Sequence, residues 1–213
     1  MEFKCHVEFI TKTISHDIIV CRGAPGSGKS TYIKELLSNY EDHTTDNYFM
    51  KNGKYSFNIV LLAGNHVLNQ LDVLLSLKQG KRVVIGNTHG KQWELKPYFV
   101  MANMFGLSLQ VITFENLYGN VHGVPETVVT GIQQSIIESP IRSVEEVLSS
   151  SYPEFARKKI ESLVFSTDEE FLCNIQNESS ENKELLKEQR NLINQKIEVL
   201  GLGKDIVREF ILP

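Results

Sequence analysis

The residues with the clearest chemical use form a glycine-rich run at positions 23–31. Gly23 is followed after four residues by Gly28, Lys29 and Ser30, which matches the phosphate-binding pattern G-x-x-x-x-G-K-[ST]. Glycines let the backbone wrap around a phosphate with its N–H groups pointing inward, and the N-terminus of a following helix adds a positive dipole end. The pattern places Lys29 on the β and γ phosphates and the Ser30 hydroxyl on Mg2+. The sequence therefore predicts a nucleotide site.

The elements around this run fit that use. A β-branched block at 17–22 predicts a buried strand before the glycines, and apolar residues with helical spacing follow at 32–37. Further helices and strands alternate along the chain: helix 58–77, strand 81–86, helix 93–105 and strand 107–114. This alternation predicts an α/β fold with a mainly parallel sheet, a three-layer α/β/α arrangement of the P-loop NTPase type. Ligands bind such sheets at the carboxyl ends of the strands.

Past Pro140 the pattern becomes helical. We predict a P-loop domain over 1–140 and a helical extension over 141–213 with short helices at 144–151 and 154–165, a polar linker at 174–182 and a final helix at 183–200. The final helix carries a narrow apolar stripe, which either docks on a core or pairs with a second copy or another protein. The stripe consists of Leu185, Leu186, Gln189, Leu192, Ile193, Lys196, Ile197 and Leu200.

Composition narrows the class of protein. The chain has 213 residues, of which 41% are hydrophobic and 23% charged, so a disordered or fibrous chain is not expected. A net charge of -4 argues against a surface that grips nucleic acid all over, although a small basic cleft fits. Three widely spaced cysteines, Cys5, Cys21 and Cys173, indicate reduced thiols. We expect an intracellular protein, cytoplasmic or nuclear, without a secretory signal or a membrane span.

Asp46 is the residue that suggests a reaction. It follows the glycine loop after one short helix, where we expect a second strand to end. A carboxylate at the carboxyl end of a strand beside a phosphate loop can accept the proton of an attacking hydroxyl during phosphoryl transfer. An Asp before Asn47 and Tyr48 can equally cap a turn. Both uses stay open on the residues alone.

Four motifs together resemble a known family. The chain looks like the P-loop kinases of the polynucleotide 5′-hydroxyl kinase type, in the zeta-toxin and polynucleotide-kinase branch, and is also similar to kinase-like domains of certain ubiquitin-ligase-binding proteins. The resemblance covers roughly residues 17–138. Its motifs are Gly23–Thr31, Thr45–Phe49 with Gly53-Lys54-Tyr55, Val84–His89 with Trp93-Glu94, and Asn120–Pro125.

The resemblance implies roles for individual residues. It makes Asp46 the general base and Lys29 the residue that holds ATP, with Ser30 as the Mg2+ ligand. Transfer of the γ-phosphoryl group to the 5′-hydroxyl of an RNA or DNA end would follow. The loop implied to bind the nucleotide consists of Gly23, Ala24, Pro25, Gly26, Ser27, Gly28, Lys29, Ser30 and Thr31.

The chain departs from the family pattern at three positions. Phe49 stands where the phage enzyme has an arginine that contacts the acceptor's phosphate. Gly86 stands where the family usually has Asp, which leaves Asn87 as the polar residue after that strand. Gly119 stands where a lid arginine usually precedes the Asn-x-His-Gly-Val-Pro motif. Such an arginine stabilises charge on the transferred group, so we consider other sources of that charge.

His122, Arg142 or a residue from a partner can replace the missing lid charge, or the reaction is slow without it. His122 and Arg142 each have an ordinary alternative. His122 can donate to a phosphate or can brace its Gly- and Pro-containing loop. Arg142 can reach the site or can be a solvated surface cation. Trp93 can stack on a base of the acceptor or can pack its helix on the sheet. The aromatic residues near Asp46 either line the surface on which the acceptor binds or pack in the core. They are Tyr48, Phe49, Tyr55 and Phe57.

The sequence therefore leaves three functions. The first is an ATP-dependent kinase acting on a polynucleotide 5′-hydroxyl. The second is an ATP-binding interaction protein with weak or no kinase activity, whose C-terminal helices bind a partner. The third is a small-metabolite or toxin-like kinase that uses the same base. The segment 114–124 is expected to be a lid over the nucleotide in any of the kinases.

Overall fold

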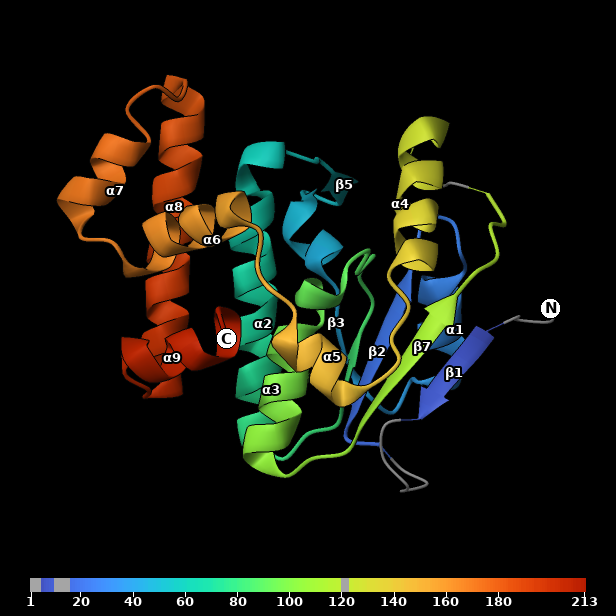
Figure 1. The fold of residues 1–213 in the computed structure, drawn as a ribbon. Coiled ribbons are helices and arrows are strands. Elements are labelled where there is room, and N and C mark those ends of the chain that lie inside the picture. Colours follow the sequence, from blue (N-terminus) through green and yellow to red (C-terminus); the bar gives the residue numbers. More distant parts are fainter. Residues whose placement is uncertain (1–4, 10–15, 120–122) are drawn as a thin grey trace. The chain divides into compact units, whose positions relative to one another are not determined.

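The strand predicted before the glycine loop lies at the centre of a five-stranded sheet. In the computed structural model, which describes residues 16–119 and 123–213 and the backbone of 5–9, this strand is β2 (Ile18–Gly23), buried along its whole length (Figure 1). It pairs in parallel with β6 (Val83–Ile85) on one side and β7 (Leu109–Phe114) on the other. The edges are β3 (Glu41–His43), parallel to β6, and β1 (Cys5–Phe9), antiparallel to β7.

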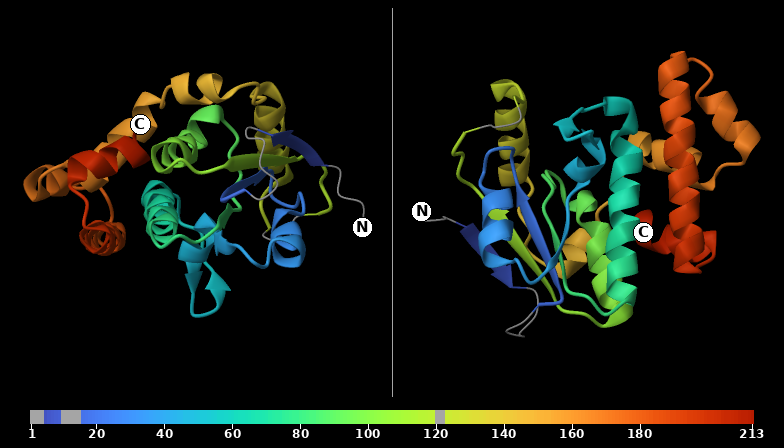
Figure 2. Two further views of the ribbon diagram at one scale, coloured as in Figure 1. Left: turned by 90° about the horizontal axis from the view of Figure 1, so that it is seen from below. Right: turned by 180° about the vertical axis from the view of Figure 1, so that it is seen from behind.

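Helices cover both faces of this sheet. α1 (Lys29–Leu36) lies on one face and α4 (Glu126–Glu138) on the other (Figure 2). On the α1 face, Ile33 and Leu37 are buried in a cluster with strand residues that include Ile19 and Cys21. Burial of each such aliphatic side chain stabilises the fold by about 1.5–3 kcal/mol. The remaining helices beside the sheet are η3 (Gln92–Glu94), α3 (Lys96–Phe105) and α5 (Val144–Ser149).

The chain forms two units that interleave along the sequence. The sheet unit contains Met1–Thr44 and Ser76–Ser150, and the helical unit contains Thr45–Leu75 and Ser151–Pro213. Helix α2 (Leu62–Lys78) belongs mostly to the helical unit and ends in the sheet unit. The other elements of the helical unit are η1 (Thr45–Phe49), β4 (Met50–Lys51), β5 (Lys54–Tyr55), η2 (Ile59–Leu61), α6 (Glu154–Ile160), the π-helical turn η4 (Glu161–Phe165), α7 (Asp168–Asn174), α8 (Ser180–Leu200) and α9 (Lys204–Ile211).

The apolar stripe of the final predicted helix faces a core. Within α8, the side chains of Leu186, Ile193, Ile197 and Leu200 are buried, and Gln189 donates from Nε2 to Leu61 O over 2.9 Å. The docking interpretation of the stripe is therefore the one that the structure shows. The helix begins at Ser180, three residues before the predicted start, because the Ser179 hydroxyl caps it by accepting from the Asn182 N–H.

The mixed α/β architecture with four parallel strands confirms the coarse fold prediction. The division into 1–140 and 141–213 stays a prediction. The segment around Asp46 differs from expectation, since the strand β3 ends at His43 and Asp46 lies in the first turn of the 3-10 helix η1. The segment Ile59–Lys78 is long and apolar enough to cross a membrane; 56% of that window is buried in the structure, and core helices of globular proteins pass the same test.

Candidate functional site

The glycine loop has a backbone that requires glycine. Gly26 has φ 80° and Gly28 has φ 90°, in the left-handed region that residues with a side chain rarely adopt. Gly28 is also the N-cap of α1, so the first helical N–H groups follow it directly. At Gly23, an added Cβ would come within 2.6 Å of Ser27 Oγ and 2.9 Å of Phe114 Cβ. The close turn therefore depends on these glycines.

Lys29 points its ammonium group into the loop. Its Nζ donates to Gly23 O over 2.7 Å, to Ala24 O over 3.0 Å and to Ser27 Oγ over 3.3 Å. The side chain is only 8% exposed although it carries a charge. A buried ammonium surrounded by loop carbonyls lies where phosphate oxygens can replace these acceptors. Ser30 and Thr31, next in the helix, are exposed.

Loops from both neighbouring strands contact the glycine loop. Gly23 N donates to Thr88 O over 3.1 Å, in the loop after β6, and Tyr118 N donates to Gly26 O over 2.8 Å, in the loop after β7. The chain leaves β6 on one side of β2 and returns as β7 on the other, which is the switch point where α/β sheets bind ligands. Tyr118 belongs to the predicted lid; His122 of that lid lies outside the described residues.

The end of β6 leaves no room for a side chain at Gly86. A Cβ at Gly86 would lie 2.7 Å from Ile33 Cδ1 and 2.9 Å from Thr44 Oγ1, so side chains already fill this space. Asn87 and His89 follow and are both buried, and the His89 ring meets the Tyr98 ring edge-on at 5.5 Å. Asn87 thus lies one residue before Thr88, whose carbonyl holds the glycine loop.

Glu94 is a half-buried acid close to Arg22, the residue before the glycine loop, and the sequence alone did not single it out. Burial raises its pKa to about 7, although N–H groups of Gly90 and Lys91 and the charge of Arg22 act in the opposite direction. Arg22, the residue before Gly23, is itself buried and donates to Ser139 O over 3.1 Å. The Trp93-Glu94 pair was visible in the sequence, but the partial burial of Glu94 depends on packing that only the fold shows.

Asp46 belongs to the helical unit and is exposed. Its Oδ1 accepts a 3.1 Å hydrogen bond from the Tyr55 hydroxyl, and burial together with the Asp46 charge raises the pKa of Tyr55 to about 12. Beside it, Thr45 Oγ1 lies 3.2 Å from His66 Nδ1. Burial lowers the pKa of His66 to about 4, against the opposing pull of Asp46, so this imidazole is neutral at pH 7. Asp46 is thus an accessible carboxylate with a phenol as its donor.

The 3-10 helix that carries Asp46 is anchored on both flanks. The Tyr48 hydroxyl donates to Asp72 of α2, and Lys196 of α8 forms an ion pair with the same carboxylate. Burial and the Asp72 carboxylate raise the pKa of Tyr48, so its phenol stays protonated and donates. Phe49 is 1% exposed, with its ring 5.0 Å from that of Phe57. Phe49 therefore packs in the interior of the helical unit.

The structure assembles the sequence-derived site only in part. The sheet unit contains the glycine loop, Gly23–Thr31, and also Asn87. Asp46 lies in the helical unit. Arg142 lies in the sheet unit with 76% of its side chain exposed and an ion pair to Glu146 at 3.8 Å, as expected of a surface cation. Within the described residues, no group of three or more His, Cys, Asp or Glu side chains suits a metal ion.

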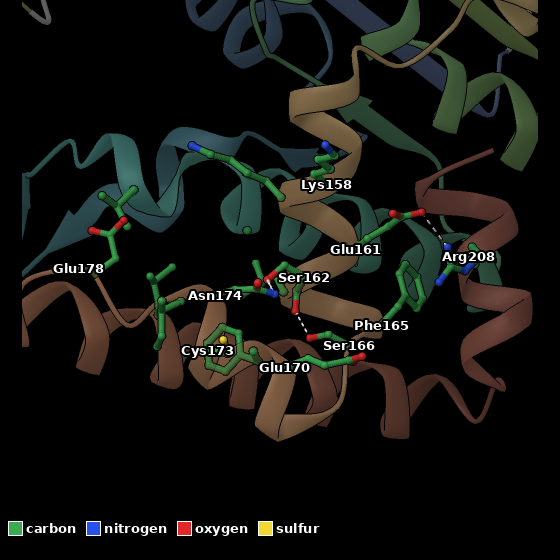
Figure 3. A pocket seen from close by; sticks show the side chains of 18 residues that line it. Lys158, Glu161, Ser162, Phe165, Ser166, Glu170, Cys173, Asn174, Glu178 and Arg208 are labelled. Carbon is green, nitrogen blue, oxygen red and sulfur yellow. Dashed lines mark hydrogen bonds and ion pairs between the residues drawn. The ribbon is translucent and has the colours of Figure 1, made fainter.

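The helical unit also contains a cavity of about 840 Å³ that the sequence did not indicate. Figure 3 shows the π-helical turn η4 along it, with Ser162 and Asn174 joined by a 2.8 Å hydrogen bond and Glu161 paired with Arg208. The buried Arg190 of α8 donates to Leu163 O of the same π-helical turn over 2.7 Å. Charges of both signs line the cavity, among them Lys158, Lys159, Glu161, Glu170, Glu178 and Arg208.

Among the relatives found by comparison with known proteins are two that have limited identity to this chain. The chain is 26% identical over 218 residues to human NEDD4-binding protein 2, an alignment that covers 92% of this chain and 12% of that protein. It is 23% identical over 142 residues to the uncharacterized protein PM0531 of Pasteurella multocida strain Pm70, covering 59% of this chain and 79% of that protein. No family model matches. The similarity supports a relationship to NEDD4-binding protein 2, of which the chain spans about an eighth.

Proposed function

We propose that the chain is an ATP-dependent phosphotransferase of the P-loop kinase type, acting on a hydroxyl at the 5′ end of a polynucleotide. The observation that carries the proposal is the position of Lys29, buried inside a glycine loop with its ammonium on the loop carbonyls. The α1 N-terminus and two left-handed glycines provide the backbone that phosphates require. The order of strand, loop and helix agrees with the motif.

ATP and Mg2+ fit the donors and acceptors of this loop. Lys29 would exchange its carbonyl acceptors for phosphate oxygens, and the exposed Ser30 hydroxyl is a hard oxygen ligand of the kind that Mg2+ takes. Bound Mg2+ supplies charge neutralisation on the phosphates. The chain's own contribution is to hold the nucleotide through backbone N–H groups and one ammonium.

Asp46 is proposed as the general base. It follows His43, the last residue of β3, by three residues, and β3 runs in the same direction as β2, which leads into the glycine loop. Its carboxylate takes the proton of the acceptor hydroxyl while the hydroxyl oxygen forms a bond to the γ-phosphorus, and the bond to ADP breaks. Tyr55 donates to Asp46 and orients it.

Labelled γ-phosphate from Mg-ATP, offered with RNA, DNA and free nucleosides that carry a 5′-hydroxyl, tests the reaction. We expect label on a polynucleotide end, and loss of it in Lys29→Ala. Lys34→Ala is the matched control, because Lys34 is exposed on the same helix. Label on nucleosides alone would identify a metabolite kinase instead. Absence of label on every acceptor, with ATP binding intact, would contradict the phosphotransferase assignment.

An ATP-binding interaction protein is the second candidate. The relative NEDD4-binding protein 2 is named for binding NEDD4, and Phe49, Gly86 and Gly119 remove groups that speed transfer in the resembling kinases. This candidate predicts tight Mg-ATP binding without turnover, and capture of a purified NEDD4-type ubiquitin ligase that depends on the bound nucleotide. Transfer to a 5′ end at an enzymatic rate would exclude it.

A further inference from the structure

A short hairpin follows Asp46 in the helical unit. In it, β4 pairs with β5 so that Met50 lies opposite Tyr55 and Lys51 opposite Lys54. The turn uses Asn52 at φ 50° and Gly53 at φ 75°, the left-handed pair of a tight two-residue connection. Two strands of two residues have little stability alone, so their retention depends on what they contact.

The two lysines form an unusual pair. Lys51 and Lys54 are directly opposite in the hairpin and both are exposed. In the part of the chain that the structure describes, neither forms an ion pair, and no acidic residue lies between 50 and 57. Like charges at opposite positions of a strand pair are destabilising. An anion bound across the two ammonium groups would remove that cost.

Aromatic rings lie beside the lysine pair. Tyr55 is 37% and Phe57 54% exposed. Both contact the buried Phe49, at ring distances of 6.0 and 5.0 Å, and Ser56 N donates to Phe49 O over 2.8 Å. The rings are therefore held in place while their outer surfaces stay open. Exposed, fixed aromatic rings are the surfaces on which unpaired bases stack.

We propose that this hairpin, with Tyr55 and Phe57, binds the first nucleotides of a single-stranded nucleic acid, its bases on the rings and its phosphates on Lys51 and Lys54. The proposal rests on the proposed function, because it gives the acceptor strand a path that begins at Asp46. Tyr55 links the two places through its 3.1 Å hydrogen bond to Asp46. A 5′-hydroxyl end is neutral where it meets that carboxylate, and the phosphates begin one nucleotide later.

An anionic membrane also suits lysines and aromatic rings. The exposed Asp46 carboxylate, hydrogen-bonded to Tyr55, argues against it, because headgroup phosphates would meet a like charge at the edge of the patch. A strand with a hydroxyl end avoids that contact. The nucleic acid is therefore the occupant that the charges favour, and vesicles serve as the alternative in the experiment.

Fluorescence anisotropy of a 3′-labelled eight-nucleotide single strand with a 5′-hydroxyl, measured over a range of salt concentrations without ATP, tests the proposal. For Lys51→Ala with Lys54→Ala, we expect the slope of log K against log salt to become shallower by about 1.4, since each phosphate contact on a single strand contributes about 0.7. Phe57→Ala should weaken binding at least about fivefold.

Matched variants separate local from general effects. Lys158→Ala with Lys159→Ala removes the same charge from two exposed lysines of α6, and Phe155→Ala removes another exposed ring. These variants should leave the slope and the affinity unchanged. Equal effects of the hairpin and control variants would overturn the proposal. Hairpin-dependent binding to phosphatidylserine vesicles, with no binding of the oligonucleotide, would overturn it in favour of a membrane.

The result is independent of the kinase activity. Phosphoryl transfer that depends on Asp46, together with oligonucleotide binding that ignores the hairpin variants, would refute the hairpin and keep the kinase. A hairpin-dependent salt slope, together with no transfer to any acceptor, would keep the strand-binding site and refute the kinase.

Discussion

Gly86 is a position where the structure predicts the cost of a side chain. Gly86→Ala would place a Cβ 2.7 Å from Ile33 Cδ1, about 1 Å closer than a comfortable carbon contact. Ile33 is 5% exposed in the cluster beneath α1, so its terminal methyl must leave its preferred rotamer to make room. That movement costs about 0.5–1.5 kcal/mol, and crowding of the core adds to it.

Two effects oppose each other in the single variant. Alanine lowers the conformational entropy of the unfolded chain, which stabilises by about 0.4–1 kcal/mol, while the clash destabilises. We therefore expect a net loss of about 1 kcal/mol in the free energy of unfolding for Gly86→Ala. Ile33→Val removes the clashing Cδ1 and by itself costs about 0.5–1.5 kcal/mol.

The double variant isolates the contact. In Gly86→Ala with Ile33→Val, the new methyl enters the space that Cδ1 leaves, and only the 2.9 Å approach to Thr44 Oγ1 remains. The pair should therefore be more stable than the two single losses imply, by about 1 kcal/mol. Urea unfolding of the four proteins gives the coupling energy directly. Additivity within about 0.3 kcal/mol would refute the idea that Ile33 Cδ1 fills the space beside Gly86.

Two further predictions concern stability. Because burial raises the pKa of Glu94 in the folded state to about 7, the folded state binds this proton more tightly than the unfolded state. The contribution of Glu94 to the free energy of unfolding should be fully present below about pH 4.5 and should be lost as the pH rises through 7, by about 3 kcal/mol in total. Glu94→Gln should flatten the pH dependence of urea unfolding, and an unchanged profile would contradict the assignment. Arg190→Met should lower the free energy of unfolding by about 2–4 kcal/mol, because the carbonyls of Ser162, Leu163 and Ser166 lose their donor. The control Lys187→Met, on the exposed side of α8, should change the free energy of unfolding by less than about 0.5 kcal/mol.

The glycine loop and its flanking strand and helix could be predicted because their signals are local. The β-branched run at 17–22 must be buried, and two left-handed glycines bring the chain into α1. The final helix could also be predicted from its stripe. The start of this helix at Ser180 follows from the Ser179 cap. The cap is hard to identify in the sequence because the stretch around it has several Asn and Ser residues that can each cap a helix.

Other features depend on contacts between distant residues. The pairing of Lys196 with Asp72, the anchoring of Tyr48 and the burial of Phe49 join segments that no local pattern connects. The same holds for Glu94, whose pKa follows from burial rather than from its neighbours in sequence. The short helix α9 follows Gly203 without a side-chain cap, so nothing marks its start, although Val207, Phe210 and Ile211 recur at helical spacing.

The proposed phosphoryl transfer requires Asp46 and the Lys29 loop to act together. Single-turnover transfer of labelled phosphate from Mg-ATP to a 5′-hydroxyl strand, compared among the unchanged protein, Asp46→Asn and the exposed control Asp205→Asn, tests it most directly. We predict that Asp46→Asn slows transfer about 10²–10⁴-fold with ATP affinity unchanged, and that Asp205→Asn does not slow it. Equal transfer rates for Asp46→Asn and the unchanged protein would contradict the account.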